Sequence, residues 1–72
     1  MTTATSIAIA ANGKPFTLAA GTRLPDFLDE LGFEPALVVV ERNRQALTPS
    51  ETRDTVLEEG DRLEIVQITA GG

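Results

Sequence analysis

The sequence contains no cysteine and no histidine. The lack of cysteine excludes disulfides, iron–sulfur ligation and thiolate zinc sites, and it suits a protein of a reducing compartment. The lack of histidine removes the commonest general base and the commonest metal ligand of proteins. We therefore expect no metal site and no catalytic residue in this chain.

Long apolar stretches are also missing. The longest apolar run, from Ala36 to Val40, is far too short to cross a membrane. Residues 1–6 carry no positive side chain and lead into no long apolar stretch, so they do not resemble a signal peptide. The default expectation is a soluble cytoplasmic protein without a membrane partner.

Basic residues are few, because six lysines and arginines stand against eleven acids and give a net charge of −5. Nucleic-acid binding draws much of its affinity from basic side chains on phosphates, so this balance argues against a nucleic-acid partner. An acidic surface would suit a partner with a basic docking surface, but a charge of this size is also ordinary for a small soluble domain. The sequence has two pairs of neighbouring acids, Asp29-Glu30 and Glu58-Glu59. We interpret the first as part of a solvated helix face and the second as part of a turn, rather than as a metal or acid–base site.

The first elements of this chain of 72 residues predict a β-hairpin over residues 7–18. Ile7 and Ile9 share one face of the first strand. Asn12-Gly13 is the strongest short hairpin signal, because both central positions of the turn need a positive φ. Phe16 and Leu18 then alternate along the second strand.

Residues 24–31 predict an amphipathic helix. Its apolar side chains recur at i, i+3, i+4 and i+7, which places on one stripe the residues that we expect in the core: Leu24, Phe27, Leu28 and Leu31. Thr22 is the expected N-cap, and Pro25 falls in the first turn, where a missing N–H does no harm. Gly32 fits the left-handed position that ends a helix.

The second half of the chain predicts further strands. Residues 37–41 are apolar on both faces and indicate a central strand. Asn43-Arg44 is the expected turn into a short strand over residues 45–47. A helical turn follows, with Thr48 or Ser50 as its cap.

The last segment is a connection followed by a strand. Val56 and Leu57 are the expected apolar anchors of the connection. Residues 59–61 predict a tight turn in which Asp61 bonds local backbone. Residues 62–66 alternate in polarity, with the two apolar side chains Leu63 and Ile65 facing one way.

This order of elements predicts an α+β protein of the β-grasp, or ubiquitin-like, type. The expected architecture is a roll with a mixed four- to five-stranded sheet, one main helix and a short helical turn, in which the last strand runs beside the first. We expect residues 1–72 to form a single domain, with residues 68–72 as a flexible C-terminal tail.

The sequence ends in Ala70-Gly71-Gly72. Glycine has no Cβ, so such an end is thin, takes almost any backbone angle and can enter a narrow site. Two terminal glycines also arise by chance, and chain termini are often simply disordered. The tail alone therefore does not decide the function.

The stretch from Leu57 to Ile65, followed shortly by Ala70-Gly71-Gly72, is similar to the C-terminal half of the prokaryotic sulfur-carrier proteins. These are the ThiS family of thiamine biosynthesis and the related MoaD family of molybdopterin biosynthesis. Residues 37–43 also resemble the central ThiS strand and the Asn turn after it. ThiS fits better, because residues 67–69 replace the Pro-Pro that commonly precedes the MoaD terminus. Arg44 is a departure, since the ThiS family often has glycine there.

The resemblance implies a carrier and co-substrate rather than an enzyme. A ThiF-type adenylyltransferase, itself binding ATP and magnesium, would adenylate the carboxylate of Gly72. A persulfide would then supply sulfur, and the resulting thiocarboxylate would donate it to thiazole synthase for the thiazole ring of thiamine. Gly71 and Ala70 would keep the tail thin, and this chain would bind no cofactor itself.

An outward patch is expected on the last strand. If Leu63 and Ile65 face the helix, then Val66 and Ile68 face outward, and Val39 extends the patch. Apolar residues on the open face of a sheet indicate partner docking, although scattered apolar residues on a surface are normal.

Other functions share these features. A MoaD-like carrier or a ubiquitin-like modifier, which joins Gly72 to a lysine, would use the same tail. A regulatory or RNA-binding β-grasp module is a third class, against which the acidic balance and the terminal glycines count.

Overall fold

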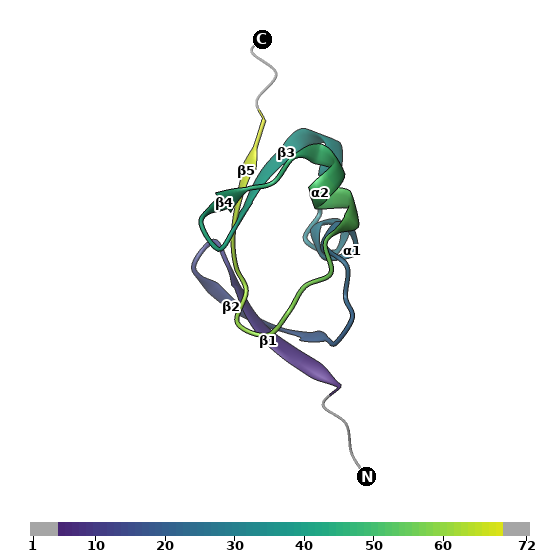
Figure 1. Ribbon diagram of the computed structural model, residues 1–72, viewed down its shortest axis with the longest axis vertical. Helices are drawn as coiled ribbons and strands as arrows, with labels where there is room; N and C mark the ends of the chain where they lie inside the picture. Colours follow the sequence, from purple (N-terminus) through teal and green to yellow (C-terminus); the bar gives the residue numbers. More distant parts are fainter. Residues whose placement is uncertain (1–4, 69–72) are drawn as a thin grey trace.

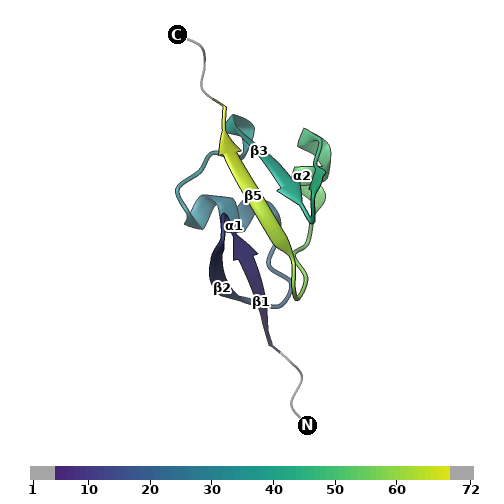
Figure 2. The same cartoon turned by 90° about the vertical axis from the view of Figure 1, so that its left-hand side faces the viewer.

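The computed structural model describes residues 5–68, which form one sheet with helices on one of its faces (Figure 1). The sheet has five strands in the order β2-β1-β5-β3-β4, and β5 is its central strand. Figure 2 shows the opposite face, with β5 running across it and α1 behind. The elements are β1 (Ser6–Ala11), β2 (Lys14–Ala19), α1 (Leu24–Glu30), a 3-10 helix η1 (Pro35–Leu37), β3 (Val38–Arg42), β4 (Gln45–Ala46), α2 (Pro49–Asp54) and β5 (Arg62–Gln67).

The β1–β2 hairpin is confirmed. Asn12 and Gly13 both have positive φ, at 50° and 80°, as the tight turn requires. The antiparallel register places Ile9 opposite Phe16 on the face toward the helix. The Phe16 ring meets Phe27 of α1 edge to face, with 5.2 Å between the ring centroids. The hairpin is thereby fixed to the main helix.

Helix α1 begins at Leu24 as expected, but its N-cap and its last residue differ from the sequence expectation. Leu24, Phe27 and Leu28 are fully buried, but Leu31 lies past the last helical turn and is 36% exposed, so its assignment to the core is wrong. Thr22 is not the N-cap, because its hydroxyl donates to the carbonyl of Ala19. The backbone N–H of Leu24, the first helical residue, donates instead to the carbonyl of Thr55 in the connection before β5.

The sheet is mixed. β5 runs parallel to β1 and antiparallel to β3, so the expected pairing of the last strand with the first is confirmed. β3 has neighbours on both sides but begins at Val38, because Leu37 belongs to η1. The side chains of Val40, Leu63 and Ile65 point into the core beneath the helices.

The segments on either side of β4 form the turn and the helix cap that the sequence indicates. Asn43 and Arg44 have φ of 52° and 71°, so arginine occupies a conformation that normally favours glycine. Thr48 caps α2 in a capping box with Glu51. α2 has six residues against seven in α1, so it exceeds the single turn expected.

The connection before β5 has one apolar anchor rather than two. Leu57 is buried, whereas Val56 is exposed and forms only a backbone bridge with Arg23, so Val56 was wrongly assigned as an anchor. The buried side chain of α2 is Thr52. Within residues 5–68 no helix has the length and apolar character needed to cross a membrane.

Candidate functional site

The open face of the sheet carries an apolar patch beside the end of β5. Val39 of β3 and Val66 of β5 lie directly opposite each other and are 44% and 61% exposed. Ile68 follows Val66 on the same face and is 52% exposed, and its backbone N–H donates to the carbonyl of Leu37 at 2.8 Å. Leu37 is also exposed. We call these four residues the apolar patch.

The exposure of the patch follows from strand alternation. Leu63 and Ile65 of β5 are buried, so the alternate side chains of that strand must face solvent. The outward orientation of Val39, Val66 and Ile68 was predictable on this basis, and their role in partner binding stays a prediction. Leu37 was missed, because it was assigned to a strand rather than to η1.

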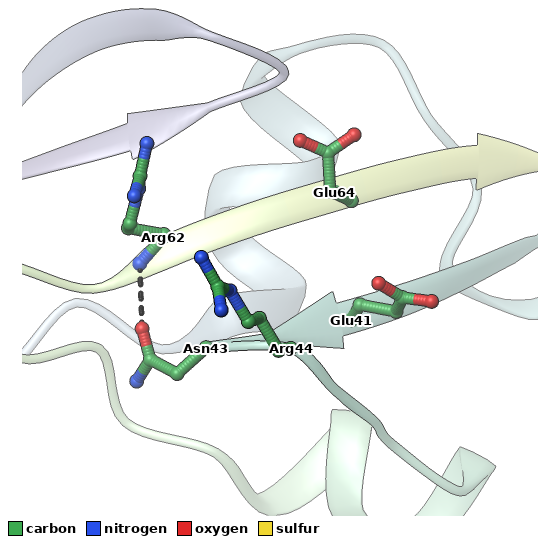
Figure 3. Close-up of a pocket in the computed structure, with 5 residues that line it drawn as sticks. All are labelled: Glu41, Asn43, Arg44, Arg62 and Glu64. Carbon is green, nitrogen blue, oxygen red and sulfur yellow. Dashed lines mark hydrogen bonds between the residues drawn. The ribbon is translucent and has the colours of Figure 1, made fainter.

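Charged side chains adjoin the apolar patch. Glu41 and Glu64 are directly opposite each other on β3 and β5, one outward position away from Val39 and Val66. Together with Asn43, Arg44 and Arg62 they line a hollow of about 510 Å³ (Figure 3). In this close-up the Arg44 side chain leaves the β3–β4 turn and extends toward β5.

The charges that line the hollow are not tied to one another by ion pairs. Within residues 5–68 the salt bridges are those of Arg42, which lies on the other side of β3. The two acids and two arginines of the hollow are therefore available to side chains of another molecule. A mixed charge pattern beside an apolar patch is typical of the rim and centre of a protein interface.

A buried network fixes the end of β3 to the start of β5. Asp61 is 4% exposed, and its carboxylate accepts hydrogen bonds from the Arg42 Nε at 3.0 Å, the Asn43 Nδ2 at 3.1 Å and the backbone N–H of Glu58 at 2.9 Å. Arg42 also donates to the carboxylate of Glu58 at 3.2 Å. Asn43 accepts the backbone N–H of Arg62 at 2.9 Å, the bond drawn in Figure 3. Asp61 thus does bond local backbone, as expected, and it also joins two distant segments.

The network sets the charge state of Asp61. Burial by itself would raise the pKa of this carboxyl. The backbone N–H of Glu58 and the side chains of Arg42 and Asn43 outweigh that effect, so the pKa of Asp61 lies below its ordinary value. Asp61 is therefore ionised at neutral pH, and its carboxylate is bonded to Arg42, Asn43 and Glu58 within the fold. This makes Asp61 a structural residue.

Metal-ligating clusters and unpaired buried polar side chains are absent from the part of the chain that the structure describes. Between Thr5 and Ile68 no three acidic side chains converge in a way that could hold a metal ion. Every buried side-chain nitrogen and oxygen in this range has a hydrogen-bond partner. The predicted tail covers residues 68–72, and of these only Ile68 lies within the described residues. The predicted reactive residue Gly72 and its neighbours Ala70 and Gly71 lie outside them.

Comparison with known proteins places these features in a family. The ThiS family model matches residues 4–72. A thiazole synthase from Magnetococcus marinus is 41% identical over 61 residues, which make up 85% of this chain and 19% of that protein. The chain therefore spans about a fifth of that relative's length. The uncharacterised protein ycf40 of Pyropia yezoensis is 34% identical over 67 residues, 93% of this chain and 94% of its own.

Two solved structures share the fold. The crystal structure of the thiamine biosynthesis protein ThiS from Geobacter metallireducens matches with a TM-score of 0.75 and 28% identity, over 92% of this chain and all of the other. A designed protein based on human erythrocytic ubiquitin matches with a TM-score of 0.56 and 18% identity, over 96% and 98% of the two chains, which shows likeness of fold alone. These matches confirm the β-grasp fold, and the family match over nearly the whole sequence establishes that this chain belongs to the ThiS family.

Proposed function

We propose that this chain is a sulfur carrier of thiamine biosynthesis, with the carboxylate of Gly72 as the group that takes up sulfur. The observation that carries the proposal is the family match, which extends to Gly72 and so includes Ala70-Gly71-Gly72. The similarity to the Geobacter ThiS structure over all of that chain supports the same role. The chain then acts as a co-substrate, and the catalytic groups belong to its partners.

The chemistry of the tail requires activation. A carboxylate is a poor electrophile, so a ThiF-type adenylyltransferase with ATP and magnesium converts it to an acyl adenylate and releases pyrophosphate. A persulfide anion attacks the carbonyl carbon and displaces AMP, which leaves an acyl disulfide. A thiol then attacks the outer sulfur and releases the thiocarboxylate, while the thiol and the donor sulfur become a disulfide. Covalent activation divides one difficult step into easier ones.

The apolar patch supplies the docking surface in this proposal. Val39, Val66 and Ile68 lie at the end of the sheet where β5 leads toward the tail, so a partner that covers them also receives the last residues. A thiazole synthase of which one part matches this chain supports that enzyme as a partner. The ThiF-type enzyme and the persulfide donor follow from the chemistry that the tail requires.

Intact mass spectrometry tests the proposal. The chain is incubated with ATP, magnesium, a ThiF-type enzyme and a persulfide source. We expect a gain of about 16 Da, the exchange of oxygen for sulfur, that requires ATP. A lysine-linked conjugate would instead support a protein modifier. An unchanged mass under conditions that load an established ThiS protein would contradict the carrier role.

A further inference from the structure

The backbone hydrogen bonds of β5 alternate strictly between its two neighbours. The carbonyl of Arg62 accepts from Asn43 and the N–H of Ile68 donates to Leu37, so the even-numbered residues of β5 face β3. The odd-numbered residues face β1, since the carbonyl of Asp61 accepts from Ala10 and that of Leu63 accepts from Asn12, each at 2.9 Å.

Asn12 closes the ladder on the β1 side. β1 pairs with β5 only through Ala10 and Ala11, and then the chain turns away into β2. The side-chain amide of Asn12 takes the place of the next strand residue: its Oδ1 accepts from the backbone N–H of Ile65 at 2.8 Å, and its Nδ2 donates to the carbonyl of Ile65 at 3.3 Å. Ile65 is therefore the last residue of β5 bonded on this side.

Gln67 is the next residue of β5 whose backbone faces that side. By the same alternation its N–H and C=O point past the end of β1, and among residues 5–68 no partner meets them there. On its other side Gln67 lies beside Val38 of β3, which holds it in strand conformation. A preformed strand with one open donor and one open acceptor is a template for a further strand.

The two outer edges of the sheet are poorly suited to pairing with a further strand, whereas the open side of β5 at Gln67 is well suited to it. Ala11 and Lys14 flank the two-residue turn as a bonded pair, so Pro15 is the first residue of β2 whose backbone faces the open edge, where it offers no N–H. At the other outer edge β4 has only two residues. Gln67 instead lies between the exposed apolar side chains of Val66 and Ile68, with neither proline nor charge beside it.

We propose that an extended strand of thiazole synthase adds to β5 at Gln67, on the side that Asn12 leaves open. The inference rests on the proposed function, and the choice of partner rests on the relative in which a matching segment is part of a thiazole synthase. Five residues separate Gln67 from the carboxylate of Gly72, which limits that carboxylate to about 18 Å from the added strand. Main-chain pairing would hold the base of the tail in a fixed direction while the apolar patch supplies contact area.

Amide hydrogen exchange of the full chain tests this directly. In the free protein the N–H of Gln67 should exchange much faster than that of Ile68, which is bonded to Leu37. Saturation with thiazole synthase should slow exchange at Gln67 at least about tenfold. An unchanged rate at Gln67 in the saturated complex overturns the inference, as does a lack of complex formation.

A pair of variants gives an independent readout. Gln67→Pro removes the N–H that faces the open side and leaves the bonds to β3 in place, whereas Gln67→Ala keeps that N–H and removes the side chain. We expect Gln67→Pro to weaken binding to thiazole synthase about tenfold, the size of one lost hydrogen bond, and Gln67→Ala to bind within about twofold of the original chain. Equal affinities of the two variants, or a stronger effect of Gln67→Ala, would overturn the inference.

The outcome is separable from that of the proposed function. Sulfur loading is measured by mass without thiazole synthase, so a chain that loads and binds but shows no protection at Gln67 contradicts strand addition alone. For Gln67→Pro, the exchange rate of the Ile68 amide reports whether β5 remains paired with β3. If that variant loses the pairing, chemical N-methylation of Gln67 in the otherwise unchanged chain replaces it, with the same tenfold loss expected.

Discussion

Arg42 holds Asp61 through two of its guanidinium nitrogens, with the Nη2 at 2.9 Å and the Nε at 3.0 Å from the same carboxylate oxygen. The pair joins the end of β3 to the residue that precedes β5. These are the two strands that carry Val39 and Val66. The alignment of the apolar patch therefore depends on a charged contact at the far end of the two strands.

Removing the charge of Asp61 should destabilise the fold. We expect Asp61→Asn to lower the free energy of unfolding at pH 7 by about 2 kcal/mol, because Arg42 loses its buried partner. Urea unfolding followed by circular dichroism measures this. Glu58→Gln is the matched control: Glu58 is the exposed partner of Arg42, so its loss should cost less than about 0.5 kcal/mol. Equal effects of the two changes would contradict the account.

The same pair predicts a dependence on acid. The pKa of Asp61 is lowered in the folded protein, so its contribution is complete above the pKa of the unfolded chain, about 3.9. That contribution is lost as the pH falls through the lower pKa of the folded state. The difference in unfolding free energy between the original chain and Asp61→Asn should therefore shrink below about pH 4. If this difference in unfolding free energy stays constant down to pH 2, the ionised form of Asp61 is not what stabilises the original chain.

Arg44 should be replaceable with a gain in stability. Its φ of 71° costs an L-residue about 1 kcal/mol, and glycine adopts this conformation freely. We expect Arg44→Gly to raise the unfolding free energy by about 0.5–1 kcal/mol, or the melting temperature by a few degrees. Gln45→Gly, one residue on and within β4, should lower stability instead. A loss of stability in Arg44→Gly would mean that contacts of the Arg44 side chain stabilise the fold by more than its positive φ destabilises it.

A substitution of Val66 tests whether the apolar patch binds a partner. Val66→Asp places a charge in the centre of the patch and should weaken binding to thiazole synthase or a ThiF-type enzyme by about tenfold or more. Thr17→Asp adds the same charge to an exposed outward position of β2, away from the patch, and should bind within about twofold. Isothermal titration calorimetry measures both. Similar losses in the two variants would point to net charge rather than to the patch.

Much of the fold could be predicted because its signals are local. Asn12-Gly13 determines a turn by backbone conformation alone, and Thr48 with Glu51 forms a capping box within four residues. Alternation along β5 then decides which side chains face outward, so Val66 was placed correctly.

The errors and omissions arise from long-range contacts. Thr22 failed as a cap because the N–H of Leu24, the first residue of α1, donates to the carbonyl of Thr55, far along the sequence. Arg42 and Asp61 are 19 positions apart in the sequence, and no spacing rule predicts such a pair. The open side of Gln67 depends on where β1 ends relative to β5, which only the assembled sheet defines.

Gly72 is the position on which the chemistry depends. Appending one residue after Gly72 should abolish sulfur loading and leave the melting temperature unchanged, because the added residue displaces the reacting carboxylate without touching the described fold. Gly72→Ala should also block loading, since its methyl group thickens a tail that has to enter a narrow site. The mass of each chain after incubation with ATP, a ThiF-type enzyme and a persulfide reports the result. Full loading of the extended chain would contradict the role of Gly72.

Transfer of labelled sulfur tests the central claim most directly. The chain is loaded with ³⁴S, freed of the persulfide donor, and supplied to thiazole synthase with the remaining substrates of the thiazole ring. The account predicts that the thiazole product carries the heavy isotope and that the chain returns to its original mass. A thiazole product without the label, formed while the chain keeps its sulfur, would contradict the assignment of this protein as the sulfur donor.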